Sequence, residues 1–162
     1  MAMTIQLGEK VPSLTLHHKT ADGVEEISTD DIFDDKKVVL FALPGAFTPT
    51  CSASHLPGYL VRSDEILARG VDRIVCLSVN DAHVMRAWGE QQNVEDRILM
   101  IADGNGYFTH AVGLELDSRQ GGMGMRSQRY AMIVNNGVVE LLNVEAPKKF
   151  EVSDADTILA SL

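Results

Sequence analysis

Residues 38–51 read VVLFALPGAFTPTC and connect an apolar run to a helical pattern that begins near Pro49. The apolar run is typical of a strand buried on both faces, expected at 37–43. Thr48 suits the N-cap, and Pro49 suits the first helical position because the N–H that proline lacks would be unpaired there. Cys51 is therefore predicted in the first turn of a helix, where unpaired N–H groups and the helix dipole favour a thiolate.

The segments on either side of this stretch alternate between strand and helix patterns. Upstream, residues 11–18 and the segment around Ile27 flank a turn at 21–23 and predict a hairpin, followed by a short helical turn over 28–33. Downstream, apolar spacing predicts a helix from Pro49 to about Arg69 with a kink near Pro57. Further elements are expected at 72–79 (strand), 80–91 (helix), 98–102 (strand), 107–112 (short helix), 129–134 and 138–142 (hairpin strands) and 153–162 (helix). Asn80-Asp81 is expected to cap the helix at 80–91, and the run Ser153-Asp154-Ala155-Asp156 the helix at 153–162.

This order of elements predicts an α/β fold. A βαβ unit followed by a hairpin and a final helix is compatible with a mixed central sheet flanked by helices, which is a thioredoxin-like arrangement with an N-terminal hairpin extension. The chain has 162 residues and contains no linker, internal repeat or low-complexity segment. We therefore expect a single domain over residues 1–162.

Composition narrows the class of protein. The hydrophobic content of 45% and the charged content of 23% are ordinary for a globular protein, and no apolar run approaches the roughly 18 residues that a membrane span needs. The net charge of −9 opposes binding to nucleic acid or to an anionic membrane. The N-terminal residues lack the pattern of a secretory signal, and two cysteines without a Cys-x-x-Cys pair favour thiol chemistry in the cytoplasm.

The active-site pattern resembles that of a known family. Pro44-x-x-x-Thr48-x-x-Cys51, and the longer run PGAFTPTCS over 44–52, resemble the type II, or peroxiredoxin-5-like, peroxiredoxins. The resemblance continues at 74–81, 87–88, 102–104, 113–116 and 126–130, hence over most of the chain. It implies a thiol-dependent peroxidase that reduces hydrogen peroxide and organic hydroperoxides through a sulfenic acid on Cys51, without a bound cofactor.

The resemblance also implies roles for individual residues. Cys51 corresponds to the peroxidatic cysteine, Thr48 to its hydroxyl partner, Pro44 to the residue that shields the pocket and Arg129 to the guanidinium that precedes the aromatic residue of a late strand. Arg126 is a candidate for a supporting role and is expected in a loop.

Ionisation of the thiol alone explains little of the rate expected of such an enzyme. An ordinary thiol with a pKa of about 8.5 is about 3% ionised at pH 7, so complete ionisation raises the reaction rate at most roughly 30-fold. Groups that align the peroxide must supply the rest.

Three further residues have weaker assignments. Gly45 and Phe47 lie beside the nucleophile in sequence, and an exposed Phe47 could contribute to the interface of the homodimer that the resemblance implies. Cys76 lies in an apolar strand pattern, so it is expected to be a core residue rather than a resolving cysteine. The sulfenic acid on Cys51 then needs an external thiol. Glutathione with glutaredoxin is favoured, because type II relatives often use this pair, and thioredoxin is the alternative.

Two other classes of function remain open at this point. His55 lies one helical turn after Cys51, so a cysteine hydrolase or transferase that uses a Cys–His pair, or a metal site, is conceivable. A redox-silent interaction module with a thioredoxin-like fold is the other possibility. The remaining histidines show no ligand spacing relative to the cysteines, and no metal is predicted.

Overall fold

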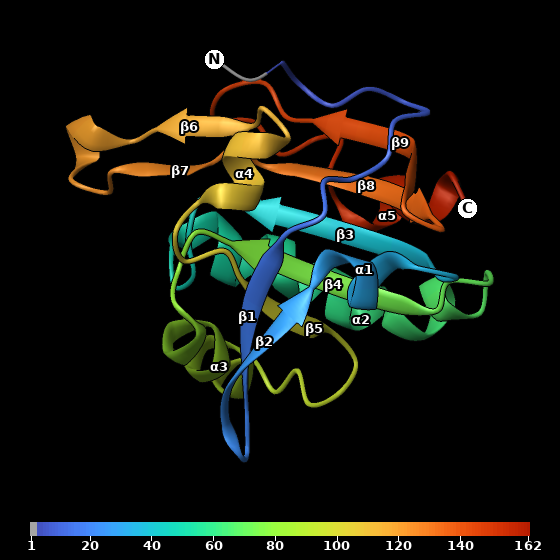
Figure 1. The fold of residues 1–162 in the computed structure, drawn as a ribbon, viewed down its shortest axis with the longest axis horizontal. Helices are drawn as coiled ribbons and strands as arrows, with labels where there is room; N and C mark the ends of the chain where they lie inside the picture. The colour runs from blue at the N-terminus through green and yellow to red at the C-terminus, as the bar shows by residue number, and fades with distance from the viewer. Residues whose placement is uncertain (1–2) are drawn as a thin grey trace.

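The computed structural model describes residues 3–162 and has a seven-stranded mixed sheet at its centre (Figure 1). The strand order is β2-β1-β5-β4-β3-β8-β9. The strands are β1 (Thr15–Thr20), β2 (Gly23–Ser28), β3 (Lys37–Leu43), β4 (Arg73–Ser78), β5 (Leu99–Ala102), β8 (Tyr130–Asn135) and β9 (Val138–Val144). Strands β3, β4 and β5 are parallel, whereas β8 is antiparallel to β3 and the β1–β2 hairpin adds to β5. The predicted mixed sheet and N-terminal hairpin are confirmed.

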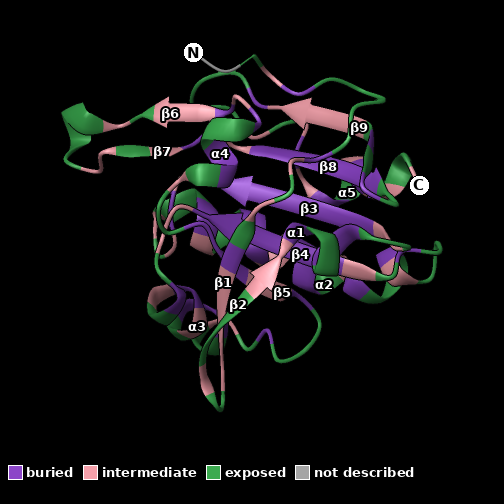
Figure 2. Cartoon of the chain, viewed as in Figure 1, coloured by how far each residue is buried: buried purple, intermediate pink, exposed green. Residues whose placement is uncertain are grey.

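Each face of the sheet carries its own apolar core. Along β3, Val39, Phe41 and Leu43 face one core, whereas Val38 and its alternate neighbours face the other. The first core includes residues of α2 (Leu56–Leu67), α3 (Ala82–Gln91) and α5 (Ala155–Ala160). The second includes residues of α1 (Thr29–Phe33) and α4 (Tyr107–Ala111). Figure 2 shows that the central strands between these cores are buried, as expected for a strand apolar at every position.

The helix that follows β3 begins with an irregular turn. Residues 49 and 50 are helical, Cys51–His55 form a π-helical segment, and α2 continues from Leu56. The Leu56 N–H donates to the carbonyl of Cys51, five residues back. Pro57 has no N–H for the carbonyl of Ser52 in this register, and the Gln92 side-chain amide donates to that carbonyl instead, at 3.2 Å. The irregularity expected near Pro57 is therefore a π-helical segment just before it.

A second, two-stranded sheet projects from the body of the molecule (Figure 1). It consists of β6 (Glu115–Asp117) and β7 (Met125–Ser127), joined around a 3₁₀ turn at Arg119–Gly121. The expectation that Arg126 lies in a loop was wrong, because Arg126 pairs with Leu116 in this ribbon. Strands of three residues are too short to leave a periodic signal in the sequence.

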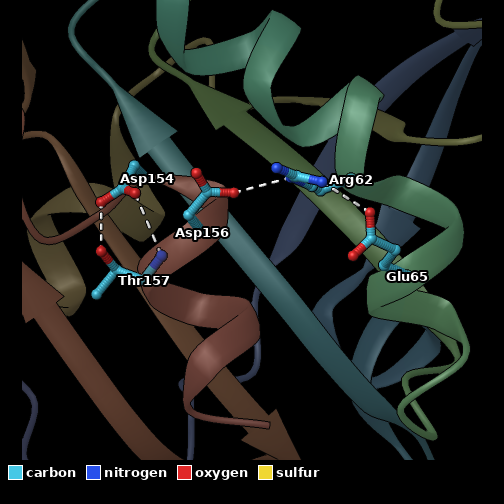
Figure 3. Close-up of polar contacts among 5 residues, drawn as sticks. All are labelled: Arg62, Glu65, Asp154, Asp156 and Thr157. Atoms are coloured by element: carbon cyan, nitrogen blue, oxygen red, sulfur yellow. Dashed lines mark hydrogen bonds and ion pairs between the residues drawn. The ribbon is translucent and has the colours of Figure 1, made fainter.

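The C-terminal helix is tied to α2 at its first turn (Figure 3). Asp154 caps α5 by accepting from the N–H and the hydroxyl of Thr157, which confirms the predicted cap. Arg62 of α2 forms ion pairs with Asp156 of α5 and with Glu65 of its own helix, both at 2.9 Å. These contacts hold α5 beside the helix that carries Cys51. Within residues 3–162, no helix has the length and apolar character required to cross a membrane.

Candidate active site

The turn after β3 delivers Cys51 to the interior of the protein. Ala46 anchors the turn by donating its N–H to the Asn80 side chain at 2.9 Å, and Phe47 adopts a positive φ of 65° with 49% of its surface exposed. The Ser52 N–H then makes the first helical bond, to the carbonyl of Thr48 at 2.9 Å. Cys51 has an exposed fraction of 0% and is a free thiol. Its sulfur is therefore covered by the surrounding residues.

Arg129 directs its guanidinium at Cys51. It immediately precedes β8, where the alternation of side chains places it on the same face as Ala131, which packs in the core beneath α2. Its Nη2 donates to the Cys51 Sγ at 3.1 Å, and its Nη1 donates to the His55 Nδ1 at 2.8 Å. The Phe150 ring lies 5.8 Å from the guanidinium carbon, a distance typical of a cation–π contact. The structure thus brings Arg129 and Cys51 together.

His55 contacts the guanidinium rather than the thiol. Its Nε2 lies 3.1 Å from the carbonyl of Ser153. Because a carbonyl only accepts, Nε2 must carry the ring proton, and the lone pair of Nδ1 is left to face Arg129. Burial, reinforced by the charge of Arg129, lowers the pKa of His55 to about 3. The ring is therefore neutral at physiological pH, and both nitrogens are engaged, so no Cys–His nucleophile pair forms here.

Arg126 lies beside Pro44 and Gly45 at the start of the turn. Its Nε donates to the Met123 carbonyl at 2.8 Å, and its Nη1 makes a long contact of 3.5 Å with the Pro44 carbonyl. A Cβ at Gly45 would lie 3.1 Å from the same Nη1, so a larger residue at this position would crowd the guanidinium. The structure therefore places Arg126, Pro44 and Gly45 together at the turn, while Arg129 contacts the sulfur.

Thr48 occupies the end of the turn, but its hydroxyl does not cap the helix. The Oγ1 donates to the Gly45 carbonyl at 2.7 Å. A hydroxyl that donates in one direction keeps its lone pairs available as acceptors. Thr48 can therefore accept a hydrogen bond from a molecule bound beside the turn, which is a different task from the predicted N-cap.

Cys76 lies in β4, opposite Phe41 of β3, and is also a free thiol with an exposed fraction of 0%. It packs in the same apolar core as Cys51. Burial raises the pKa of Cys76 well above its usual range, and the charge of Cys51 adds to this shift. Cys76 is therefore held as a neutral thiol in the core.

Several residues that support the site were missed by sequence reasoning. Ser153 supplies the carbonyl that accepts from His55 and also from the Tyr59 hydroxyl, at 2.7 Å. Phe150 stacks near His55, with ring centroids 4.9 Å apart, and Glu145 anchors the segment that carries Ser153. A backbone carbonyl leaves no mark in the sequence, so its partners could not have been found there.

No metal cluster is part of this arrangement. Among residues 3–162, no group of three or more histidine, cysteine, aspartate or glutamate side chains could hold a metal ion.

Comparison with known proteins places the chain in a family. Residues 6–159 match the family described as Redoxin. The chain is 43% identical to peroxiredoxin-2C of Arabidopsis thaliana, covering 98% of each sequence. It is 45% identical to hybrid peroxiredoxin hyPrx5 of Haemophilus influenzae, covering 99% of this chain and 67% of that one. Reduced Prx3 of Vibrio vulnificus, solved in complex with hydrogen peroxide, superposes with a TM-score of 0.94 at 58% identity, covering 98% of this chain and 99% of that one.

The chain belongs to the redoxin family, whose thioredoxin-like fold matches the mixed sheet described above. Within that family it is a type II peroxiredoxin, a thiol-dependent peroxidase. Peroxiredoxins need no prosthetic group and use a thiol as reductant. A thiol peroxidase therefore replaces the two other classes of function that the sequence left open, the hydrolase and the redox-silent module.

Proposed function

We propose that Cys51 is the peroxidatic nucleophile and that Arg129 aligns the peroxide with it. The observation that carries this proposal is the 3.1 Å contact between Arg129 Nη2 and Cys51 Sγ. The thiolate attacks one peroxide oxygen, the O–O bond breaks, and the other oxygen takes a proton and leaves as water or an alcohol. A sulfenic acid remains on Cys51. Arginine suits the task because it stays charged and can donate to the sulfur and to the leaving oxygen from one planar group.

The residues of the turn have complementary roles in this proposal. Pro44 shields the sulfur from water, and the Thr48 hydroxyl accepts a hydrogen bond from the O–H of the incoming peroxide while it donates to the Gly45 carbonyl. Arg126 adds positive charge at the turn without touching the sulfur. Hydrogen peroxide is the substrate that fits best, because Cys51 is completely buried and because the Vibrio vulnificus relative was solved with that molecule.

The sulfenic acid is then reduced by an external thiol in a one-cysteine cycle. Cys76 is a poor partner, since it lies inside a central strand as a neutral thiol, and a disulfide requires its two Cα atoms to lie within about 7 Å in a suitable geometry. An external thiol forms a mixed disulfide with Cys51, and a second thiol releases it. Glutathione with glutaredoxin is the donor we propose, and thioredoxin is the alternative. Because Cys51 is buried, either donor requires the first helical turn to open.

A comparison of reductants tests this cycle. Peroxide consumption is measured for the wild type and for Cys76→Ala with glutathione plus glutaredoxin, and separately with thioredoxin. The peroxide-treated wild type is analysed by mass spectrometry in the presence of glutathione. Full activity of the variant and a glutathione adduct on Cys51 support the proposal. Loss of turnover in the variant, together with a Cys51–Cys76 disulfide in the wild type, would refute it.

We also propose that the protein is a homodimer with its interface beside the active-site turn. Phe47 is 49% exposed, Met125 of β7 is 44% exposed and Tyr107 of α4 is 65% exposed. Exposed large apolar side chains on one region of a surface are typical of an interaction site. Light scattering of the reduced wild type and of a Phe47→Asp variant tests this proposal, and a monomeric wild type at high concentration would contradict it.

A further inference from the structure

Glu145 is a buried carboxylate that is satisfied by one short segment of backbone. It follows β9 and has an exposed fraction of only 7%. Its carboxylate accepts from the N–H groups of Glu151, Val152 and Ser153 at 2.8–2.9 Å, and from the Ser153 hydroxyl at 2.8 Å. No ion pair within residues 3–162 involves it. Burying a charge in this way is costly, which suggests that the segment it holds must be placed accurately.

The segment held by Glu145 determines how His55 faces Arg129. The Ser153 N–H and hydroxyl are bound to the carboxylate, while the Ser153 carbonyl accepts from His55 Nε2. That carbonyl fixes the proton on Nε2 and leaves the Nδ1 lone pair for Arg129 Nη1. A shift of Ser153 would therefore rotate the ring or allow the tautomer with the proton on Nδ1, and Arg129 would lose the acceptor that sets its direction.

The same residue is also tied to the backbone of Arg129. The Glu145 N–H donates to the Arg129 carbonyl at 2.9 Å, at the point where β8 and β9 pair. The contacts therefore form a closed ring: from the Arg129 backbone to Glu145, through its side chain to Ser153, from Ser153 to His55, and from His55 to the Arg129 guanidinium. Glu145 is thus linked both to the backbone of Arg129 and, through Ser153 and His55, to its guanidinium.

We infer that Glu145 is a positioning residue of the peroxidase site, which acts through Ser153 and His55 to aim Arg129 at Cys51. The inference rests on the proposed roles of Cys51 and Arg129. A carboxylate suits this position because its Oε2 accepts from all four donors and its Oε1 also accepts from the Glu151 N–H, and hydrogen bonds to a charged acceptor are stronger than those to a neutral one. An amide would offer a neutral oxygen to these donors and would turn its own N–H₂ towards the Glu151 N–H. Partial burial raises the pKa of Glu145, but the N–H and hydroxyl donors outweigh this and lower the pKa overall, so the group is charged at neutral pH.

The docking of α5 does not depend on this ring. As Figure 3 shows, Asp154 binds Thr157, and Asp156 binds Arg62 of α2. Both contacts lie beyond Ser153 in the chain, and neither involves Glu145. A variant of Glu145 should therefore leave the C-terminal helix in place, which separates a loss of alignment from a loss of the fold.

The first test is Glu145→Gln, with Glu140→Gln as the matched control on an exposed position of β9. The second-order rate constant for oxidation of Cys51 by hydrogen peroxide should fall between about tenfold and about a hundredfold in Glu145→Gln. It should stay within about twofold of the wild type in the control, as is usual for surface substitutions. A folded Glu145→Gln protein with an unchanged rate constant would overturn the inference.

Two further measurements distinguish positioning from a general structural role. Nitrogen NMR of labelled histidine should show the His55 proton on Nε2 in the wild type. In Glu145→Gln it should show a mixture of the two tautomers, or faster exchange of the Nε2 proton with solvent. In a double-mutant cycle, Glu145→Gln should have no further effect on the rate constant once His55→Ala is present, because its influence passes through that ring. Additive effects would refute the pathway.

If Glu145→Gln does not fold, Ser153→Ala removes the hydroxyl contact but retains the carbonyl, and the same cycle with His55→Ala decides the question. A reduced rate constant that disappears in the His55→Ala background supports the inference, and an unchanged or additive one refutes it. Arg129→Ala in the same assay tests the underlying function separately. An unaffected rate in Arg129→Ala would refute the proposed function itself, whatever Glu145 does.

Discussion

The π-helical segment Cys51–His55 and the middle of β4 each carry a completely buried cysteine in the same apolar core, yet the surroundings of the two thiols differ. Cys76 is surrounded by the strands of the central sheet, and burial raises its pKa. Cys51 receives a charged donor from Arg129, which is itself held by His55. Both thiols are buried, so what distinguishes Cys51, the proposed nucleophile, from Cys76 is the guanidinium directed at its sulfur.

The largest expected effect follows from removal of the reactive sulfur. Cys51→Ser should reduce peroxide turnover to the uncatalysed background, because a hydroxyl is hardly ionised at neutral pH and is a poor nucleophile without a base beside it. Peroxide consumption with an excess of reductant measures this, and circular dichroism checks that the fold is retained. Cys76→Ala is the matched control. Turnover that persists in Cys51→Ser would mean that Cys51 is not the nucleophile.

The second effect concerns the two arginines near the turn. Arg129→Ala should lower the rate constant of Cys51 oxidation by about 10²–10³-fold, equivalent to about 2.7–4 kcal/mol, the range seen when a donor to developing charge is removed. Arg126→Ala should cost less than about tenfold, because Arg126 contacts only the carbonyls of Met123 and Pro44.

The chain contains a reporter for this measurement. Its single tryptophan, Trp88, donates from Nε1 to the Ser52 hydroxyl at 3.1 Å, directly beside Cys51. Stopped-flow fluorescence should therefore follow the oxidation. A larger loss in Arg126→Ala than in Arg129→Ala would reverse the assignment of the two guanidinium groups.

The third effect is on stability rather than rate. The pKa of His55 is about 3 in the folded protein and near 6.5 when the chain is unfolded. Between these values the unfolded chain binds the extra proton, so the free energy of unfolding should decrease as the pH falls below 6.5, by up to about 1.4 kcal/mol per pH unit. Urea unfolding at pH 7.0, 6.3 and 5.5 measures the slope above the usual range of carboxylate titration.

His55→Gln supplies the matched comparison for that slope. Glutamine cannot take up a proton in this range, so most of the decrease between pH 6.5 and 5.5 should disappear. The amide can also accept from Arg129 and donate to Ser153, which preserves much of the packing. The same pH slope in both proteins would mean that His55 does not remain neutral in the folded state.

The sequence predicted those parts of the molecule that are set by local patterns. The strand Lys37–Leu43 was found because it is apolar throughout, and the caps at Asp81 and Asp154 because these side chains accept from N–H groups three residues on. The spacing of Cys51 and His55 placed them on one face of a helix, and they do lie near each other. The spacing could not show that the Arg129 guanidinium contacts both Cys51 and His55.

The rest of the site depends on contacts with no sequence pattern. His55 is oriented by the Ser153 carbonyl, and Glu145 binds backbone N–H groups, so neither contact depends on a recognisable partner side chain. The π-helical turn arises from Pro57 together with Gln92, which is distant in the chain. The ribbon that contains Arg126 is too short for periodicity to reveal. Each of these features is determined by tertiary packing.

The smallest expected effect is that of Cys76→Ala. The side chain packs in the central sheet, so removal of its sulfur should cost about 1 kcal/mol of unfolding free energy, a typical value for a point mutation. The rate constant of Cys51 oxidation should remain within about twofold, because Cys76 makes no polar contact with Arg129 or His55 among the described residues. Alanine is preferred to serine here, since a hydroxyl buried in this strand would add the cost of an unsatisfied polar group. Urea unfolding and stopped-flow oxidation measure the two quantities on the same sample. A rate that falls by more than about tenfold while stability is kept would show that the two buried thiols act together, and the distinction between an inert and a reactive cysteine would no longer hold.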